Sequence, residues 1–201
     1  MTHHETAASF RWANASRITD QLFIGGDLDS RRLTKALRQL DELDAVGITD
    51  ILDVRIEWGD QNLVAEAKPH LRYHWLGVDD AGQEMPDEWF EAGTGLITEA
   101  LGHGGCVLVH CHMGINRGPS MGFAGMLALG WDPIQALDRI RARRPIAYIA
   151  YAEDALDWWL RKSGASMTDR HAAQAGIRRW RHDNHLDVRE AIRKVRTSEA
   201  A

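Results

Sequence analysis

Residues 105–120 read GCVLVHCHMGINRGPS, and this stretch determines the expected fold more than any other part of the chain. It begins with a short apolar run, residues 105–110, which contains β-branched residues and predicts a buried strand. Pro119 has a backbone φ suited to the first position of a helix, and the apolar and small residues 121–129 extend that helix to Gly130. The stretch therefore predicts a strand, a loop and a helix in direct succession.

The loop, residues 111–117, is predicted to bind an anion, and we call it the Cys111 loop. Its backbone N–H groups can turn inward at the amino end of a helix, where the helix dipole adds positive potential. Gly114 permits the tight curl. The same potential stabilises a thiolate, so we expect Cys111 to be ionised at neutral pH. Arg117 offers a planar guanidinium that matches two phosphoryl oxygens. A nucleophile and an anion clamp at this spacing indicate catalysis on a phosphate ester.

The pattern His110-Cys111-x5-Arg117, with a glycine inside, resembles the signature of the cysteine-dependent protein tyrosine phosphatases, and most closely their compact dual-specificity branch. Other segments resemble further parts of that domain: 18–26 and 47–55 its first strands, 73–80 the segment before its general-acid loop, and 133–145 a later helix and turn. The resemblance covers roughly residues 16–162. It implies an enzyme that forms a cysteinyl-phosphate intermediate and needs no metal or other cofactor.

By its place in the family pattern, Asp80 takes the role of general acid. It would protonate the leaving oxygen and then activate water, and Asp79 is the alternative. Residues 81–86 predict a loop that closes over substrate. The resemblance assigns substrate binding to His112, Met113, Gly114, Ile115, Asn116 and Arg117. It also implies that His110 supports the Cys111 loop through hydrogen bonds.

The chain departs from the family pattern at Gly118, where the family usually has a serine or threonine whose hydroxyl helps the thiolate leave. Ser120, two residues further on, is a candidate substitute for that hydroxyl. We therefore expect slow breakdown of the phosphoenzyme. Residues 146–151 are the second departure, because they replace a turn that contains asparagine in many relatives. The resemblance therefore does not predict which residues of this segment form the rim of the pocket.

Apolar segments near residues 21–25, 48–54, 71–76 and 105–110 predict strands, and residues 31–46, 87–101, 119–129 and 133–144 predict helices. Strands that alternate with helices indicate a single three-layer α/β domain with a mostly parallel sheet of four to five strands. Ligands bind beyond the carboxyl ends of such strands, where the Cys111 loop lies. We expect a polar tail at 1–15, a catalytic domain at 16–163 and a basic helical extension at 164–201.

Length and composition agree with this interpretation, since 201 residues with 44% hydrophobic content suffice for one domain with a core. The first residues lack an apolar signal region, and no run approaches the ~18 residues of a membrane span. We expect a soluble, cytoplasmic protein.

Charge is unevenly distributed along the chain. Residues 161–201 hold ten Lys or Arg against five Asp or Glu, although the whole chain has a net charge of −5. We expect this extension to fold back on the domain through an apolar stripe formed by Ile177, Trp180, Leu186, Ile192 and Val195. The alternative is a basic tail that docks an acidic partner, a membrane surface or nucleic acid.

Several other residues have two interpretations. Cys106 and Cys111 are too far apart along a strand to form a disulfide without distortion. His110 and His112 suggest a metal site, but no second cluster of ligands completes it. Asp53 and Arg55 have two interpretations: either they form an ion pair that shapes the pocket, or they contact the substrate directly. Arg143 and Arg144 are expected to be solvated surface charges rather than a site for a second phosphate.

The expected substrate is a phosphorylated protein that carries phosphotyrosine, phosphoserine or phosphothreonine. One alternative is a non-protein phosphatase, such as one that acts on the 5′-phosphates of RNA. Phosphoinositides fit less well, because the Cys111 loop has no lysine. Another is a phosphoprotein-binding module with weak turnover, which Gly118 leaves open. Sulfur transfer and arsenate reduction also use an activated cysteine but do not explain the segment that contains Asp80.

Overall fold

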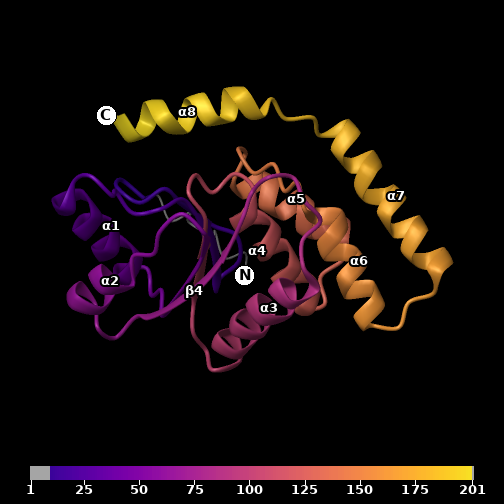
Figure 1. Cartoon of the computed structure of the whole chain (residues 1–201), viewed down its shortest axis with the longest axis horizontal. Helices are drawn as coiled ribbons and strands as arrows, with labels where there is room; N and C mark the ends of the chain where they lie inside the picture. Colours follow the sequence, from indigo (N-terminus) through magenta and orange to yellow (C-terminus); the bar gives the residue numbers. More distant parts are fainter. Residues whose placement is uncertain (1–9, 201) are drawn as a thin grey trace, which may run out of the picture.

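Five strands form one sheet in the order β1-β2-β5-β3-β4, and helices cover both of its faces (Figure 1). β1 runs antiparallel to β2, whereas the other neighbouring pairs are parallel. The computed structural model describes residues 10–200. The strands are β1 Ala15–Arg17, β2 Leu22–Gly25, β3 Asp50–Arg55, β4 Arg72–Val78 and β5 Val107–His110. The helices are α1 Leu33–Ala45, α2 Gln61–Ala67, α3 Asp87–Gly102, α4 Arg117–Ala128, α5 Pro133–Arg143, α6 Ala152–Lys162, α7 Met167–Asp183 and α8 Val188–Ala200.

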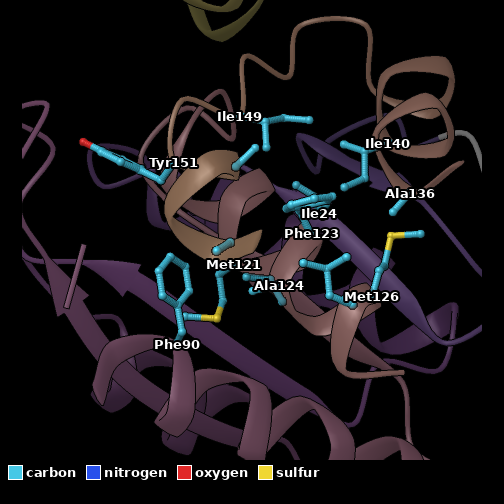
Figure 2. Packing of buried hydrophobic residues seen from close by; sticks show 14 of the residues in the cluster. Ile24, Phe90, Met121, Phe123, Ala124, Met126, Ala136, Ile140, Ile149 and Tyr151 are labelled. Atoms are coloured by element: carbon cyan, nitrogen blue, oxygen red, sulfur yellow. The ribbon is translucent and has the colours of Figure 1, made fainter. Parts of the chain in front are cut away.

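Alternation along the buried strands divides the apolar core into two clusters. Successive side chains of a strand point to opposite faces. Leu22 and Ile24 of β2 therefore join the cluster that contains α3 to α6, while Phe23 joins the cluster that contains α1 and α2. Figure 2 shows part of the larger cluster, with Ile24 from the sheet beside Phe123 of α4. β2 and β5 are buried on both faces and are almost continuously apolar, whereas the equally buried β3 also contains Asp50, Asp53 and Arg55.

The single α/β domain predicted from the sequence is confirmed, with strands near the predicted positions. The sequence predicted a sheet of four to five strands but gave positions for only four of them. The fifth strand, β1, has only three residues, which is too short for a periodic pattern. The predicted boundaries of the tail, domain and extension stay a prediction.

Part of the predicted polar tail lies against α1. The carboxylate of Glu42 accepts hydrogen bonds from the backbone N–H groups of Arg11, Trp12 and Ala13. These bonds satisfy three donors that have no strand partner, and they explain why residues 10–14 are ordered on the domain. The remainder of the predicted tail, residues 1–9, lies outside the described residues.

The extension after α6 consists of two helices, and α8 runs back across the domain (Figure 1). Ile177 and Trp180 of α7 join the larger core cluster. The indole Nε1 of Trp180 also donates to Oδ1 of Asp138 at 2.7 Å. The fold-back expected from the apolar stripe is therefore confirmed: Ile177 and Trp180 pack in the core, and Leu186, Ile192 and Val195 pack in a separate cluster with Ile115.

α8 follows a break that the sequence pattern did not predict. The side chain of Asp187 accepts hydrogen bonds from the backbone N–H groups of Arg189 and Glu190, which caps the new helix. Ala191 and Val195 of α8 then pack against Ile115 of the Cys111 loop. Over residues 10–200, no helix combines the length and apolar character that crossing a membrane requires.

We predict that Trp180→Ala lowers the free energy of unfolding by about 3–5 kcal/mol, because it removes a buried aromatic ring and leaves Asp138 without its indole donor. Urea unfolding followed by circular dichroism measures this change. Trp131→Ala is the matched control, since the Trp131 side chain is 36% exposed, and it should cost about 0.5 kcal/mol or less. Equal losses in the two variants would show that α7 is not part of the stable core.

Candidate active site

The Cys111 loop connects the carboxyl end of β5 to the amino end of α4, as the sequence predicts. Cys111 is 3% exposed, and Arg117 is the first residue of α4. Gly114 has a φ of +65°, and a Cβ at this position would lie 2.5 Å from the backbone oxygen of Gly25. A side chain at residue 114 would therefore collide with β2, so the curl of the loop depends on glycine.

Glu57, which the sequence analysis did not single out, binds the guanidinium of Arg117. Nη1 and Nη2 of Arg117 donate to Oε2 and Oε1 of Glu57 at 2.9 and 2.7 Å, and Nη1 also donates to the backbone oxygen of Val78 at 2.9 Å. The third nitrogen, Nε, is buried and makes no hydrogen bond within residues 10–200. Nε instead faces Oδ2 of Asp80, which lies 3.5 Å away.

The pair of Arg117 and Glu57 is charged at neutral pH. Burial alone would lower the pKa of Arg117, but its hydrogen bonds to Glu57 and the negative charge of Cys111 raise that pKa above its ordinary value. In turn, the hydrogen bonds from Arg117 lower the pKa of Glu57. Glu57 lies just beyond the carboxyl end of β3, where ligands of a parallel sheet gather. That position was the signal in the sequence that could have identified it.

Asp80 reaches the Cys111 loop. Its Oδ1 accepts hydrogen bonds from Nδ2 of Asn116 and from the hydroxyl of Tyr151, each at 2.7 Å. Its Oδ2 lies 3.5 Å from Nε of Arg117. Asp79 and Asp80 are both exposed residues, but the hydrogen bond described for the Asp79 carboxylate is local, from the backbone N–H of Asp80 to Oδ1 of Asp79. This geometry favours Asp80 over Asp79 as the proton donor.

Tyr151 comes from the segment that departs from the family pattern. Burial and the hydrogen bond to Asp80 raise the pKa of Tyr151 to about 12, so its hydroxyl stays protonated and acts as a donor. Its backbone N–H donates to Oγ of Ser120 at 3.3 Å. Ser120 is fully buried, and this contact joins α4 to the start of α6. Ser120, which the sequence predicts to be a supporting residue, thus accepts a hydrogen bond from the backbone of Tyr151.

A buried ion network lies behind the loop at the end of β3. Nη2 of Arg55 donates to Asp53 at 2.7 Å and to Asp60 at 2.5 Å, and Nη1 donates to Asp27 at 3.3 Å. Nδ1 of His112 lies 2.8 Å from Oδ2 of the same Asp27. Asp53 and Arg55 are both 0% exposed. Of their two interpretations, the structure therefore supports the ion pair that shapes the pocket.

His110 lies buried directly before Cys111. Its Nε2 is 3.8 Å from Oδ1 of Asp53, and its Nδ1 has no hydrogen-bond partner in the described part of the chain. Burial lowers the pKa of His110, so the ring is neutral at pH 7. Its expected support of the loop through hydrogen bonds therefore stays a prediction. Among residues 10–200, no group of three His, Cys, Asp or Glu side chains is arranged to hold a metal ion.

The prediction that Arg144 is a solvated surface charge is wrong. Arg144 is 3% exposed, and its Nε and Nη2 donate to the backbone oxygens of Gly114 and Met113 at 2.6 and 3.0 Å. Nη2 also donates to Oδ1 of Asn14 at 2.9 Å. A Cβ at residue 114 would lie 2.2 Å from Nη2, so the glycine makes room for this side chain. Sequence alone cannot reveal such a contact across 30 residues.

Burial lowers the pKa of Arg144 to about 10, which still leaves the guanidinium charged at neutral pH. The acceptors described for it are neutral oxygens from the backbone, Asn14 and Ser16. The attraction between Arg144 and Cys111 opposes the effect of burial. Arg144 therefore adds a positive charge behind the Cys111 loop, where it favours a bound anion.

α8 covers the side chains on the outer part of the loop. Met113 and Ile115 pack with Ala191, Ile192 and Val195 in a small apolar cluster that is separate from the two core clusters. Ile115 is 6% exposed as a result. The extension therefore contributes directly to the surroundings of the active site.

Comparisons with known proteins identify the family of this chain. The family model of the dual specificity phosphatase catalytic domain matches residues 33–150. Protein phosphatase Slingshot homolog 3 of Mus musculus is 31% identical over 134 residues, which cover 66% of this chain and 19% of the relative. The chain matches less than a third of the length of such curated relatives.

Solved structures show the same fold. Human DUSP28 has a TM-score of 0.62 at 19% identity, over 75% of this chain and 99% of that one. PTPMT1, solved in complex with PI(5)P, has a TM-score of 0.61 at 19% identity, over 75% of this chain and 97% of that one.

The family model spans more than half of the chain, and the residues of the pattern His110-Cys111-x5-Arg117 lie at the junction of β5 and α4. This protein belongs to the dual-specificity phosphatases, within the superfamily of cysteine-dependent protein tyrosine phosphatases.

Proposed function

We propose that this phosphatase hydrolyses phosphate monoesters on proteins, at phosphotyrosine, phosphoserine or phosphothreonine, through a cysteinyl-phosphate intermediate. The observation that carries the proposal is that Asp80 contacts Arg117 at the end of the Cys111 loop. Asp80 lies 3.5 Å from the Nε of Arg117, and Arg117 ends the loop that begins with the buried Cys111. This arrangement supports the proposal that Cys111 acts as nucleophile, Arg117 as anion clamp and Asp80 as proton donor toward one phosphoryl group.

In the first step the Cys111 thiolate attacks phosphorus, the S–P bond forms and the bond to the leaving oxygen breaks. The proton for that oxygen comes from Asp80. Oδ1 of Asp80 already accepts two hydrogen bonds, so the transferable proton belongs on Oδ2, which faces Arg117. Nε of Arg117 and the backbone N–H groups of the Cys111 loop stabilise the charge on the phosphoryl oxygens.

In the second step water attacks the phosphocysteine. The carboxylate of Asp80 now accepts the proton of that water, the S–P bond breaks and the thiolate of Cys111 returns with inorganic phosphate as the product. Gly118 provides no hydroxyl to stabilise the departing thiolate. The hydroxyl of Ser120 contacts the backbone of Tyr151. We therefore expect this second step to limit turnover.

Protein substrates are supported by the character of the Cys111 loop. Its variable positions are His112, Met113, Ile115 and Asn116, and none is lysine or arginine. Met113 and Ile115 pack against apolar residues of α8, so these two loop positions contribute no charge. A polyanionic lipid headgroup would be expected to require more positive charge at these positions.

Substrate class is tested by comparing kcat/KM for four matched substrates: a phosphotyrosine peptide, a phosphoserine peptide, short-chain PI(5)P and a 5′-phosphorylated RNA. We expect at least one of the two peptides to exceed both non-protein substrates by about tenfold or more, which corresponds to ~1.4 kcal/mol of transition-state binding. A reversed ranking would reject the protein substrate and keep the phosphatase.

The mechanism is tested by rapid-quench hydrolysis of phenyl phosphate and para-nitrophenyl phosphate. We expect wild type to show a burst of phenol product and covalent phosphate on the protein, because the intermediate accumulates. Cys111→Ser should abolish both the burst and turnover, and Asp80→Asn should slow the hydrolysis of phenyl phosphate by about 10²-fold or more. Turnover by a folded Cys111→Ser variant would contradict the covalent mechanism. No turnover by folded, reduced wild type would favour a phosphoprotein-binding module.

The role of Gly118 is tested with two variants that add the same Cβ. A Cβ at residue 118 would lie 3.2 Å from the backbone nitrogen of Cys111, a tight contact that needs only a small shift. We predict that Gly118→Ser raises the steady-state rate by about 10- to 100-fold, the effect of one hydrogen bond to a charged group. Gly118→Ala controls for the added Cβ and should not raise the rate. A faster Gly118→Ala, or a Gly118→Ser that traps as much phosphocysteine as wild type, would refute the assignment.

A further inference from the structure

Both hydrogen bonds to Oδ1 of Asp80 depend on a short segment before α6. Tyr151 donates to Oδ1 from its hydroxyl at 2.7 Å. Asn116 donates from Nδ2 at 2.7 Å, and its own Oδ1 accepts a hydrogen bond from the backbone N–H of Ala150 at 2.6 Å. Movement of residues 149–151 would therefore release both donors from Asp80.

The backbone of this segment is strained. Ile149 has a φ of +58° and is 0% exposed. The left-handed region is disfavoured for any residue with a Cβ, and a β-branched residue there is a genuine outlier. Such a conformation persists only where its surroundings impose it, and outliers of this kind cluster at functional sites.

Arg181 of α7 supplies the contacts that hold the segment. Its Nη2 donates to the backbone oxygens of Ile149, at 2.8 Å, and of Ala150. Its Nη1 donates to Oε1 of Glu153 in the first turn of α6 at 3.1 Å. One half-buried guanidinium thus joins two successive carbonyls and a carboxylate. Arg181 lies beyond residues 33–150, which the family model matches, so this support comes from the extension.

We propose that Arg181 is a positioning residue, which holds residues 149–151 so that Tyr151 and Asn116 aim Asp80 at the leaving oxygen. The inference rests on the proposed role of Asp80 as general acid. Arg181 does not touch substrate, and its effect passes through the carbonyls of Ile149 and Ala150. The C-terminal extension thereby contributes to catalysis of the leaving-group step.

The dependence of the rate on the leaving group distinguishes a positioning role from a merely structural one. A poor leaving group such as phenoxide needs its proton in the transition state, whereas 2,4-dinitrophenoxide departs without one. Misplacing Asp80 should therefore slow phenyl phosphate and leave 2,4-dinitrophenyl phosphate nearly unaffected. A general loss of folded or active protein would slow both substrates equally.

The test compares kcat/KM for these two substrates in wild type, Arg181→Met and Arg178→Met. Methionine keeps much of the apolar stem and removes the guanidinium. Arg178 is the matched control, because it lies on the same helix and its Nη1 donates to Oε2 of Glu153 at 2.9 Å, the other oxygen of the same carboxylate. We expect Arg181→Met to lose about tenfold or more on phenyl phosphate and less than about threefold on 2,4-dinitrophenyl phosphate. Arg178→Met should match wild type on both.

Asp80→Asn, measured in parallel, separates failure of this inference from failure of the proposed function. If Asp80→Asn shows the leaving-group dependence and Arg181→Met slows both substrates equally or neither, the positioning role is overturned. If Asp80→Asn shows no such dependence, the assignment of the acid is wrong and the positioning role falls with it.

A double variant gives a second, independent measure. If Arg181 acts through Asp80, then Asp80→Asn/Arg181→Met should be no slower on phenyl phosphate than Asp80→Asn alone. Multiplied losses would show that Arg181 acts elsewhere and would overturn the proposal. Arg181→Lys, which keeps a donor for the carbonyls, should recover part of the rate on phenyl phosphate and provides a milder variant should Arg181→Met fail to fold.

Discussion

A loop that turns its N–H groups toward an anion must turn its carbonyl oxygens away, and buried carbonyls need donors. Four successive carbonyls of the Cys111 loop find them. The oxygen of His112 accepts from the backbone of Asp27, that of Met113 from Arg144 and Asn14, that of Gly114 from Arg144, and that of Ile115 from the backbone of Tyr148. These donors come from three separate parts of the chain. The shape of the anion site therefore depends on the assembled domain.

Two buried arginines serve this loop in different ways. Arg55 is surrounded by Asp27, Asp53 and Asp60, so its charge is compensated and the network acts as a rigid support. Arg144 is bound by neutral oxygens, so its charge remains available to attract the thiolate of Cys111. The first arrangement stabilises structure, and the second biases the site toward anions.

The C-terminal extension, α7 and α8, lies close to the segments that surround Asp80, the proposed general acid. Asp80 lies in a loop after β4, but its partners come from the Cys111 loop and from the start of α6, and these in turn are held by α7. α8 packs on the same side through Ala191 and Val195. The residues that follow α6 thus contact the segments that surround Asp80 and the Cys111 loop, where we propose that the chemistry takes place.

The sequence by itself determined the parts that follow from local order. The strand before Cys111, the helix after Arg117, the parallel sheet and the residues of the loop all follow from apolar periodicity and one spacing. Arg144 and Arg181 could not be identified in this way, because the loop carbonyls that they bind lie at least 30 positions away. Glu57 had a positional signal at the end of β3, but its partner Arg117 is 60 positions away. Only the tertiary structure brings such groups together, since a charged side chain becomes a specific contact when burial removes water and leaves it a single set of partners.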